Sequence, residues 1–297
     1  MKNLLLTGVP GWLTTALLDS LRTHPLPGLE SLTCFTDNRL PLPETPALPG
    51  LRTCVTRGRI EDTASLKRAI KSCDSVLHTA GLLHVRRTRD WYDVNTQGTK
   101  NLLDAARSSG TVQRFVFVSS NAAVGKAPRR DHLLKEEETP RPLSHYGRSK
   151  LLAEEAVRGC RAQFETVVLR PCMFYGPPVP ARHVDIYQRI LNGRMPMIGH
   201  GDYARSLTYI DHLVQACRLA LVHPNAAGET FFIADAKAYT TRSIIEAMAV
   251  ALDPTTRYLR LPAVCAPLAY AAQPRLLPEA PSGPSGQPLR LLPLTST

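Results

Sequence analysis

Tyr146 and Lys150, within the segment 145–150, are the residues whose types and spacing most directly suggest chemistry. Residues four apart lie on one face of an α-helix, so a tyrosine and a lysine at this spacing can form an acid/base pair. A free tyrosine has a pKa of about 10, which is too high for an efficient base at neutral pH, and an adjacent ammonium group favours the phenolate. We therefore predict that Tyr146 exchanges a proton with an alcohol or ketone oxygen.

A serine at a strand end supports this prediction. In a chain with nine tyrosines, a Tyr-x-x-x-Lys pair can arise by chance, so the assignment needs further motifs in a suitable order. The apolar run 115–118 indicates a buried strand, and it ends in Ser119 and Ser120. Ser120 can hydrogen-bond the reacting oxygen while a hydride moves between the substrate carbon and a nicotinamide ring.

A glycine-rich turn near the start of the chain predicts a phosphate-binding element. The apolar residues 4–6 indicate a strand, and Gly8 and Gly11 follow it just before an expected helix. Glycines here let the backbone approach a pyrophosphate at a helix N-terminus, where N–H groups and the helix dipole favour anions. Thr14 stands where a third glycine usually lies. A tight turn without a ligand is the alternative interpretation.

Asp37 and Asn38 follow the second expected strand and are candidates for binding the adenosine ribose. A carboxylate at this point accepts hydrogen bonds from the ribose and repels a 2′-phosphate, which favours NAD over NADP. Arg39 has the opposite effect, so NADP is the alternative cofactor. A simple Asp-Asn turn is the structural alternative.

Four other polar residues have ordinary structural interpretations. Asp62 precedes an expected helix and is predicted to cap it. Asn95 taken alone is predicted to be a helix-surface residue, and His78, at a strand end, a packed core histidine. Arg205 lies in an expected loop, where it either carries a solvated charge or holds a substrate phosphate or carboxylate.

The composition is typical of an ordinary soluble protein. With 297 residues, of which 43% are hydrophobic and 21% charged, the chain can bury one large core or two small ones. No apolar run reaches the roughly 18 residues of a membrane span, and the apolar start ends at Thr7, too early for a signal peptide. The seven cysteines include no Cys-x-x-Cys pair, so we expect no disulfides, no metal site and a reducing cytoplasm.

The net charge of +11 raises the question of nucleic-acid binding. The basic clusters 86–89 and 129–130 are short, are not interleaved with aromatic residues and match no nucleic-acid-binding motif. We expect instead a solvated surface that attracts anionic small molecules. The expected partners are a small-molecule substrate and a second copy of the chain in a homodimer, with neither nucleic acid nor membrane.

Strands and helices are expected to alternate through the first 170 residues. The pattern predicts strands at 3–8, 31–36, 51–56, 74–79, 114–119 and 165–170, and helices at 11–22, 63–72, 90–109 and 144–161. Short apolar strands that alternate with helices predict an α/β fold, namely a Rossmann-type doubly wound parallel sheet with helices on both faces.

Three regions are expected along the chain. Residues 1–171 are predicted to form an NAD(P)-binding domain, and residues 172–260 a smaller C-terminal substrate-binding lobe. A strand near 229–234 is expected to return to the main sheet. Residues 261–297 are rich in proline, and we expect this tail to be disordered, above all from about residue 274 onward.

Seven motifs together resemble the extended short-chain dehydrogenase/reductase family, specifically its NAD-dependent epimerase/dehydratase branch. The resemblance covers about residues 3–252, in family order. The motifs are Thr-Gly-Val-Pro-Gly-Trp-Leu at 7–13, Val-Leu-His-Thr-Ala-Gly at 76–81, Val-Asn-Thr-Gln-Gly-Thr at 94–99, Val-Ser-Ser-Asn-Ala-Ala-Val-Gly at 118–125, Tyr-x-x-x-Lys at 146–150, Leu-Arg-Pro-Cys-Met-Phe-Tyr-Gly-Pro at 169–177 and Arg-Ser-Leu-Thr-Tyr-Ile-Asp at 205–211.

The resemblance implies a role for each site residue. Ser120, Tyr146 and Lys150 correspond to the catalytic residues, with Tyr146 and Lys150 also beside the nicotinamide ribose. The other residues implied to bind the cofactor are Gly8, Gly11, Trp12 and Leu13 at the pyrophosphate, Asp37 and Asn38 at the adenosine ribose, Ile60 beside the adenine, Ala80 and Gly81 at the cofactor edge, and Asn95 in support of the site. Asn121 and Arg205 are implied to contact the substrate.

Three features depart from the family pattern. Thr14 replaces the third glycine, Arg59 stands where an aspartate is common, and a Pro-rich ending replaces further folded structure. The implied activity is hydride transfer at a secondary alcohol or ketone, with a nucleotide sugar as the substrate class. A dehydrogenase or reductase resembling the 3β-hydroxysteroid and dihydroflavonol group is the enzymatic alternative, and a cofactor-binding sensor without turnover is the alternative of another class.

Overall fold

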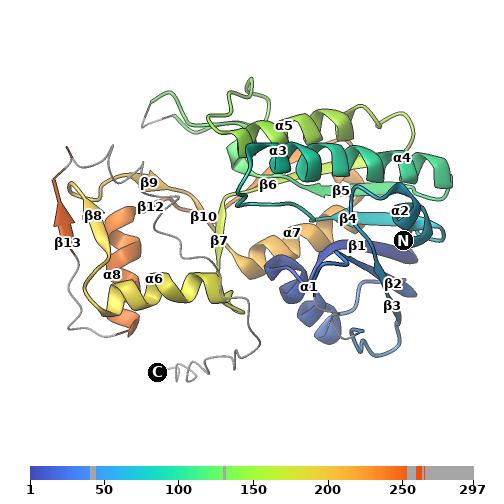
Figure 1. Ribbon diagram of the computed structural model, residues 1–297, viewed down its shortest axis with the longest axis horizontal. Coiled ribbons are helices and arrows are strands. Elements are labelled where there is room, and N and C mark those ends of the chain that lie inside the picture. The colour runs from blue at the N-terminus through green and yellow to red at the C-terminus, as the bar shows by residue number, and fades with distance from the viewer. Residues whose placement is uncertain (41–44, 130–131, 253–258, 263, 265–297) are drawn as a thin grey trace. The chain divides into compact units, whose positions relative to one another are not determined.

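The computed structural model describes residues 1–40, 45–129, 132–252, 259–262 and 264 (Figure 1). The chain divides into two compact units. The first unit comprises Met1–Pro178 and Ser206–Ala238, and the second comprises Val179–Arg205 and Tyr239–Thr297. Apart from residues 261, 262 and 264, the expected tail at 261–297 lies outside the described residues.

A seven-stranded parallel sheet forms the centre of the first unit. Its strands, in spatial order, are β11 (Thr230–Ile233), β6 (Glu165–Pro171), β5 (Arg114–Val118), β4 (Ser75–His78), β1 (Asn3–Val9), β2 (Ser31–Thr36) and β3 (Arg52–Arg57). Every neighbouring pair is parallel. The chain reverses direction across the sheet between β1 and β4, which is where doubly wound folds bind ligands. The expected Rossmann-type fold is confirmed.

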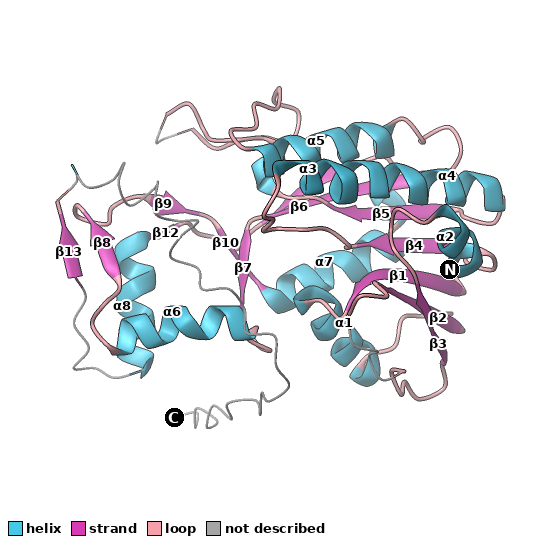
Figure 2. Ribbon diagram, in the orientation of Figure 1, coloured by secondary structure: helices cyan, strands magenta, loops and turns pink. Residues whose placement is uncertain are grey.

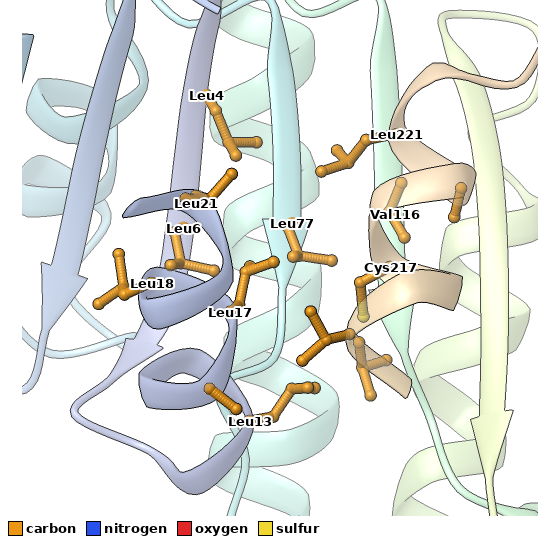
Figure 3. Packing of buried hydrophobic residues seen from close by; sticks show 14 of the residues in the cluster. Leu4, Leu6, Leu13, Leu17, Leu18, Leu21, Leu77, Val116, Cys217 and Leu221 are labelled. Atoms are coloured by element: carbon orange, nitrogen blue, oxygen red, sulfur yellow. The ribbon is translucent and has the colours of Figure 1, made fainter. Parts of the chain in front are cut away.

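Helices cover both faces of this sheet (Figure 2). On one face lie α1 (Trp12–Thr23) and α7 (Ile210–Val222), and on the other lie α2 (Thr63–Ile70), α4 (Thr99–Ser109) and α5 (His145–Arg158). Successive side chains of a strand point to opposite faces, so Leu4 and Leu6 pack with α1 and α7 while Leu5 packs with the other helices. Figure 3 shows Leu17 of α1 and Cys217 of α7 in the first of these clusters.

The helix expected at 90–109 is divided into three parts. α3 (Thr88–Trp91) leads into a π-helical segment, η1 (Tyr92–Gly98), and α4 continues from there. A Cβ at Gly98 would lie 2.5 Å from Cγ2 of Ile60, so glycine permits this contact. Ile60, implied above to lie beside the adenine, is 7% exposed and packs here in the core. π-Helical turns occur frequently at functional sites, and this one carries Asn95.

Residues after β6 contribute to both units. β7 (Met173–Tyr175) pairs in parallel with β10 (Leu207–Tyr209), and both belong to the first unit together with α7. The sequence predicts that the residues of β7, β10 and α7 belong to the lobe at 172–260, whereas in the structure they belong to the first unit. They do so because the apolar side of α7, including Leu213, Cys217 and Leu221, is buried against the main sheet.

The second unit contains α6 (Ala181–Leu191) and α8 (Thr241–Leu252), which pack together, and two small strand pairs. β8 (Pro196–Ile198) is parallel to β13 (Leu259–Leu261), and β9 (Ala204–Arg205) is antiparallel to β12 (Tyr239–Thr240). Strands of two or three residues are too short to show a period in the sequence. None of the helices in the described ranges is both long and apolar enough to cross a bilayer.

Candidate active site

The candidate catalytic residues lie beyond the carboxyl end of β5 and on α5, in the first unit. Ser120 follows β5 and caps the short 3₁₀-helix η2 (Asn121–Ala123), with its Oγ accepting from the Ala122 N–H at 3.2 Å. Tyr146 and Lys150 lie on α5, which packs against η2. Two elements that are distant in the sequence therefore bring the predicted acid/base set together.

A close contact between α5 and η2 fixes the position of Tyr146. Ser144 caps α5, because its Oγ accepts from the Gly147 N–H at 3.0 Å. A Cβ at Gly147 would lie only 2.2 Å from the carbonyl oxygen of Ala122, so glycine is required at this position. The approach lets the side chains of Tyr146 and Ser120 form a hydrogen bond.

Burial dominates the electrostatics of Tyr146 and Lys150. It raises the pKa of Tyr146, and the hydrogen bond with Ser120 offsets part of that rise. Burial lowers the pKa of Lys150 to about 7, against the attraction of the Glu154 carboxylate. The Lys150 Nζ donates to the carbonyl oxygen of Val118 at 2.7 Å. Because this pKa is near neutral, Lys150 carries only part of a positive charge at pH 7.

Asn95 connects the chain after β4 to α5. The residue is 1% exposed, and its Oδ1 accepts from the Leu82 N–H at 2.7 Å. Its Nδ2 donates to the Leu82 carbonyl oxygen and to the Ser149 Oγ, both at 3.1 Å. A Cβ at Gly81 would lie 3.2 Å from Asn95 Oδ1 and 3.8 Å from Lys150 Nζ. Asn95 thus holds the chain beside Lys150, and it is not the surface residue that its own sequence context suggests.

His78 is the centre of a buried chain of hydrogen bonds. Its Nδ1 lies 2.8 Å from Thr7 Oγ1, and its Nε2 lies 2.9 Å from Thr99 Oγ1. The Thr99 hydroxyl donates to the Asn95 carbonyl oxygen, so it accepts from the imidazole Nε2–H. Thr7 Oγ1 accepts from the N–H groups of the two residues after His78, and it donates to Nδ1. These partners assign a neutral imidazole protonated on Nε2, and the expected packed core histidine is confirmed.

We expect His78 to make the protein less stable in acid. Burial, with a smaller contribution from the charge of Lys150, lowers the His78 pKa from 6.5 to about 3. Between these two values the unfolded chain binds a proton that the folded protein does not, so the free energy of unfolding falls as pH falls. One such proton contributes a slope of about 1.4 kcal/mol per pH unit.

Urea denaturation from about pH 4 to about pH 6 measures this contribution. The matched variant is His78→Gln, because a glutamine amide can donate and accept in place of the two ring nitrogens and does not titrate. The variant should lose this part of the slope. The same pH dependence in both proteins would show that His78 is not the titrating group.

The glycine turn after β1 has the geometry that a close approach to a ligand requires. Gly8 has φ of 88°, and a Cβ there would lie 2.5 Å from Thr79 Oγ1 and 2.8 Å from the backbone nitrogen of Ala80. Gly11 is the N-cap of α1, where a Cβ would lie 2.6 Å from the Gly8 carbonyl oxygen. The first N–H groups of a helix have no partners within it, so the start of α1 can hold a pyrophosphate.

Thr14 closes this turn in place of a third glycine. It is fully buried, and its Oγ1 accepts from the Gly11 N–H at 2.8 Å and lies 3.0 Å from the Gly11 carbonyl oxygen. The side chain of Trp12 packs against Phe174, and Leu13 is buried in the core. For these two residues, the backbone is therefore the part that can meet a pyrophosphate.

An ion pair occupies the predicted ribose-binding position after β2. The Arg39 guanidinium binds the Asp37 carboxylate, with Nε 2.9 Å from Oδ1 and Nη2 at Oδ2. The hydrogen bonds from Arg39 lower the pKa of Asp37, so this carboxylate stays charged. Arg57 Nη2 donates to the Asn38 carbonyl oxygen at 2.8 Å. The predicted cofactor end thus carries arginines as well as the carboxylate.

We expect Arg39→Ala to increase the preference for NAD over NADP. Arg39 offsets part of the Asp37 charge, so a 2′-phosphate is repelled less strongly than by an unpaired carboxylate. Because the pair is exposed, its removal should weaken NADP binding by about two- to fivefold and change NAD binding less. Titration of the wild type and the variant with NAD and NADP measures these affinities. Arg52→Ala is the control, because Arg52 is an exposed arginine at the start of β3, whereas Arg57, which contacts Asn38, lies at its end. A wild-type preference for NADP would assign the 2′-phosphate to Arg39 or Arg59.

The two predicted substrate contacts lie in different units. Asn121 is the first residue of η2, and its Oδ1 lies 3.4 Å from Ser120 Oγ. Arg205 is an exposed residue of β9 in the second unit, where it is paired with Tyr239 of β12. The structure therefore brings Asn121 to the acid/base set, and it assigns Arg205 to the second unit.

Sequence reasoning missed a buried charged group next to this site. Glu154 lies one helical turn after Lys150 and binds Ser119 and Arg170. Tyr146, Lys150 and Glu154 are spaced four residues apart, so the sequence alone could have placed Glu154 on the same face of α5 as the other two. The contacts of Glu154 join three different elements, so the sequence alone does not show them.

The doubly wound sheet, the glycine turn and a tyrosine-lysine pair beside a serine define a nucleotide-binding enzyme of the extended short-chain dehydrogenase/reductase class. Residues 4–234 match the NAD dependent epimerase/dehydratase family. The chain belongs to this family, and the resemblance found in the sequence is confirmed.

Individual relatives agree with this assignment. The chain is 36% identical over 257 residues to the uncharacterized protein y4nL of Sinorhizobium fredii, covering 84% of this chain and 72% of the relative. It is 30% identical over 273 residues to UDP-glucose 4-epimerase of Vibrio cholerae, covering 89% of this chain and 80% of that enzyme. A solved structure of MoeE5 with UDP-glucuronic acid and NAD has a TM-score of 0.72 and 25% identity, covering 88% of this chain and 85% of that one. The family and its structural neighbours bind NAD.

Proposed function

We propose that this enzyme moves a hydride at a secondary alcohol or ketone carbon of a nucleotide sugar, with NAD as the hydride carrier. The observation that carries the proposal is the placement of Ser120, Tyr146 and Lys150 beyond the carboxyl end of β5. The named activity of the Vibrio relative and the UDP-glucuronic acid bound to MoeE5 support the substrate class. Net oxidation and epimerisation share the same first step, so both belong to the proposal.

The residues of the first unit fit NAD. The backbone at Gly8 and Gly11 leaves no room for a Cβ, as a close approach to a pyrophosphate requires, and Asp37 presents a charged carboxylate after β2. The residues that would hold the cofactor are Gly8, Gly11, Trp12, Leu13, Asp37, Asn38, Ala80, Gly81, Tyr146 and Lys150. Asn95 would support the chain around Gly81.

The acid/base chemistry follows from the three side chains. Bound NAD supplies a hydride acceptor and a positively charged nicotinamide ring. Tyr146 takes the alcohol proton as the carbon loses its hydride, and it returns the proton in the reverse direction. Ser120 hydrogen-bonds the same oxygen, while the Lys150 ammonium stabilises the phenolate form of Tyr146 that takes the proton.

Turnover of nucleotide sugars in the presence of NAD tests this function. Mass spectrometry of nucleotide released from the purified protein first identifies the cofactor and shows whether it is retained. Incubation with UDP- and dTDP-linked sugars is then followed by NMR for epimerisation and by NADH absorbance for net oxidation. Turnover of a hydroxysteroid but of no nucleotide sugar would replace the substrate class. NAD binding without turnover of any secondary alcohol would favour the sensor alternative.

The cellular setting remains a prediction. The cysteines in the described ranges are free thiols, five of them buried and Cys54 exposed, and free thiols fit a reducing cytoplasm. The homodimer expected above is likewise a prediction, which the molecular mass in solution would test.

A further inference from the structure

Glu154 is a fully buried carboxylate that the chemistry described above does not use. It lies on α5 one helical turn after Lys150, and Lys150 lies one turn after Tyr146. A buried ionised carboxylate is costly to the fold unless it is paired and hydrogen-bonded. Its contacts therefore show what holds it there.

Three donors from three parts of the fold bind this carboxylate. Ser119, directly after β5, donates its hydroxyl to Oε1 at 2.5 Å. Arg170 of β6 donates Nε to Oε1 at 3.0 Å and Nη2 to Oε2 at 2.8 Å, and Arg158 of α5 also binds Oε2. Two guanidinium groups therefore form charge-assisted hydrogen bonds with one carboxylate. Glu154 thus places a paired carboxylate inside the first unit.

The contacts of α5 follow consecutive residues at the end of β5. Lys150 binds the carbonyl oxygen of Val118, Glu154 binds the hydroxyl of Ser119, and Tyr146 forms a hydrogen bond with Ser120. One face of the helix therefore holds three successive residues of the strand end. The contact between Glu154 and Ser119 lies between the other two, which involve the candidate catalytic residues Lys150 and Tyr146.

We propose that Glu154 is a positioning residue of the active site, which favours the ammonium form of Lys150 and holds Lys150 against the end of β5. The charge of Glu154 attracts the Lys150 proton in opposition to burial. This inference rests on the proposed function in one respect, because the charge of Lys150 affects turnover only if Tyr146 acts as a phenolate. The charge relation between Glu154 and Lys150 itself needs no substrate.

The other groups around Lys150 do not replace this charge. His78 of β4 is neutral, because burial and the Lys150 charge both lower its pKa. The η1 segment presents the uncharged amide of Asn95, and β6 presents Arg170, whose charge repels an ammonium. The Val118 carbonyl oxygen and the Phe117 ring, whose centroid lies 4.3 Å from Nζ, also favour an ammonium, and both are uncharged. Glu154 is therefore the negatively charged group on these packed elements that favours the charged lysine.

The Glu154→Gln variant tests the inference, because it keeps the shape and the acceptor oxygen and removes the charge. The full chain is labelled with ¹³C at the lysine Cε, and NMR follows the titration, with Lys150→Met identifying the Lys150 signal. The Lys150 pKa, about 7 in the wild type, should fall by about one pH unit in Glu154→Gln. Glu155→Gln removes the same charge from an exposed neighbour and should leave the Lys150 titration unchanged.

A second variant should shift the Lys150 pKa in the opposite direction, and it should disturb folding less because the substituted side chain is partly exposed. Arg158→Gln removes a partly exposed positive charge from the Glu154 carboxylate, so the Lys150 pKa should rise by about 0.3. If Glu154→Gln does not fold alone, it is combined with Arg158→Gln, which removes the partner charge of the ion pair as well. The Lys150 pKa in this double variant should lie about one pH unit below that of Arg158→Gln alone, and this difference isolates the charge of Glu154. An unchanged Lys150 titration in the folded variants overturns the inference, whatever substrate the enzyme proves to use.

Discussion

Tyr146→Phe is expected to lower the rate of turnover by about 10²–10⁴, which is the usual contribution of a positioned acid or base. The substitution keeps the aromatic ring and its packing, and it removes the hydroxyl that is hydrogen-bonded to Ser120. NAD binding should survive, because the glycine turn after β1 and the residues after β2 are unchanged. The loss should therefore appear in kcat rather than in the affinity for NAD.

Steady-state kinetics on the nucleotide sugar found by screening measures this effect, together with a direct NAD titration. Tyr92→Phe is the matched control, because the Tyr92 hydroxyl contacts the exposed His145 and lies outside the acid/base set. A near wild-type rate in Tyr146→Phe would remove the catalytic assignment. A loss of NAD binding in this variant would instead indicate that the ring mainly supports the cofactor.

Arg205→Ala is expected to weaken nucleoside-diphosphate binding by roughly ten- to a hundredfold. A charge-assisted bidentate contact between a guanidinium and a phosphate contributes about 1.5–3 kcal/mol. Arg205 is exposed on β9 of the second unit, and the family resemblance implies that it contacts the substrate pyrophosphate. NAD affinity should not change, because the residues predicted to bind NAD lie in the first unit.

Calorimetric titration with UDP and with NAD separates these outcomes. Arg194→Ala is the control, because it removes another exposed arginine of the second unit. If the wild type does not bind UDP, or if both proteins bind it equally, the nucleotide-sugar proposal is wrong in its substrate class. A steroid or a simple alcohol would then become the next class to test, since neither needs a phosphate-binding arginine.

The main sheet and its helices could be predicted because their signals are local. Short apolar strands alternate with amphipathic helices, and the predicted cap of α2 is confirmed by the Asp62 carboxylate, which accepts from the Ala64 N–H at 3.0 Å. The two- and three-residue strands of β7, β9 and β12 were missed, since pairing defines them rather than periodicity. The π-helical segment η1 was missed for a similar reason, because it depends on how Gly98 packs against Ile60.

The candidate site was predictable in its residue types and less so in its contacts. Tyr146, Lys150 and Ser120 belong to motifs, so their types and order indicate the chemistry. The ion pair between Arg39 and Asp37 depends on the shape of one turn. That Glu154 binds Arg170 depends on how α5 packs against β6. Contacts of this kind follow from tertiary packing, which a single sequence does not display.

The buried cluster of Lys150, Glu154 and Arg170 affects how far this enzyme can be made heat-resistant by design. Well-packed apolar residues often stabilise a fold more than a buried ion pair of the same volume does. Substitutions selected only for a higher melting temperature would therefore tend to collect at these positions and to reduce activity. A stability screen that monitors turnover in parallel should find its useful variants elsewhere, in the apolar layer between the sheet and the helices α1 and α7.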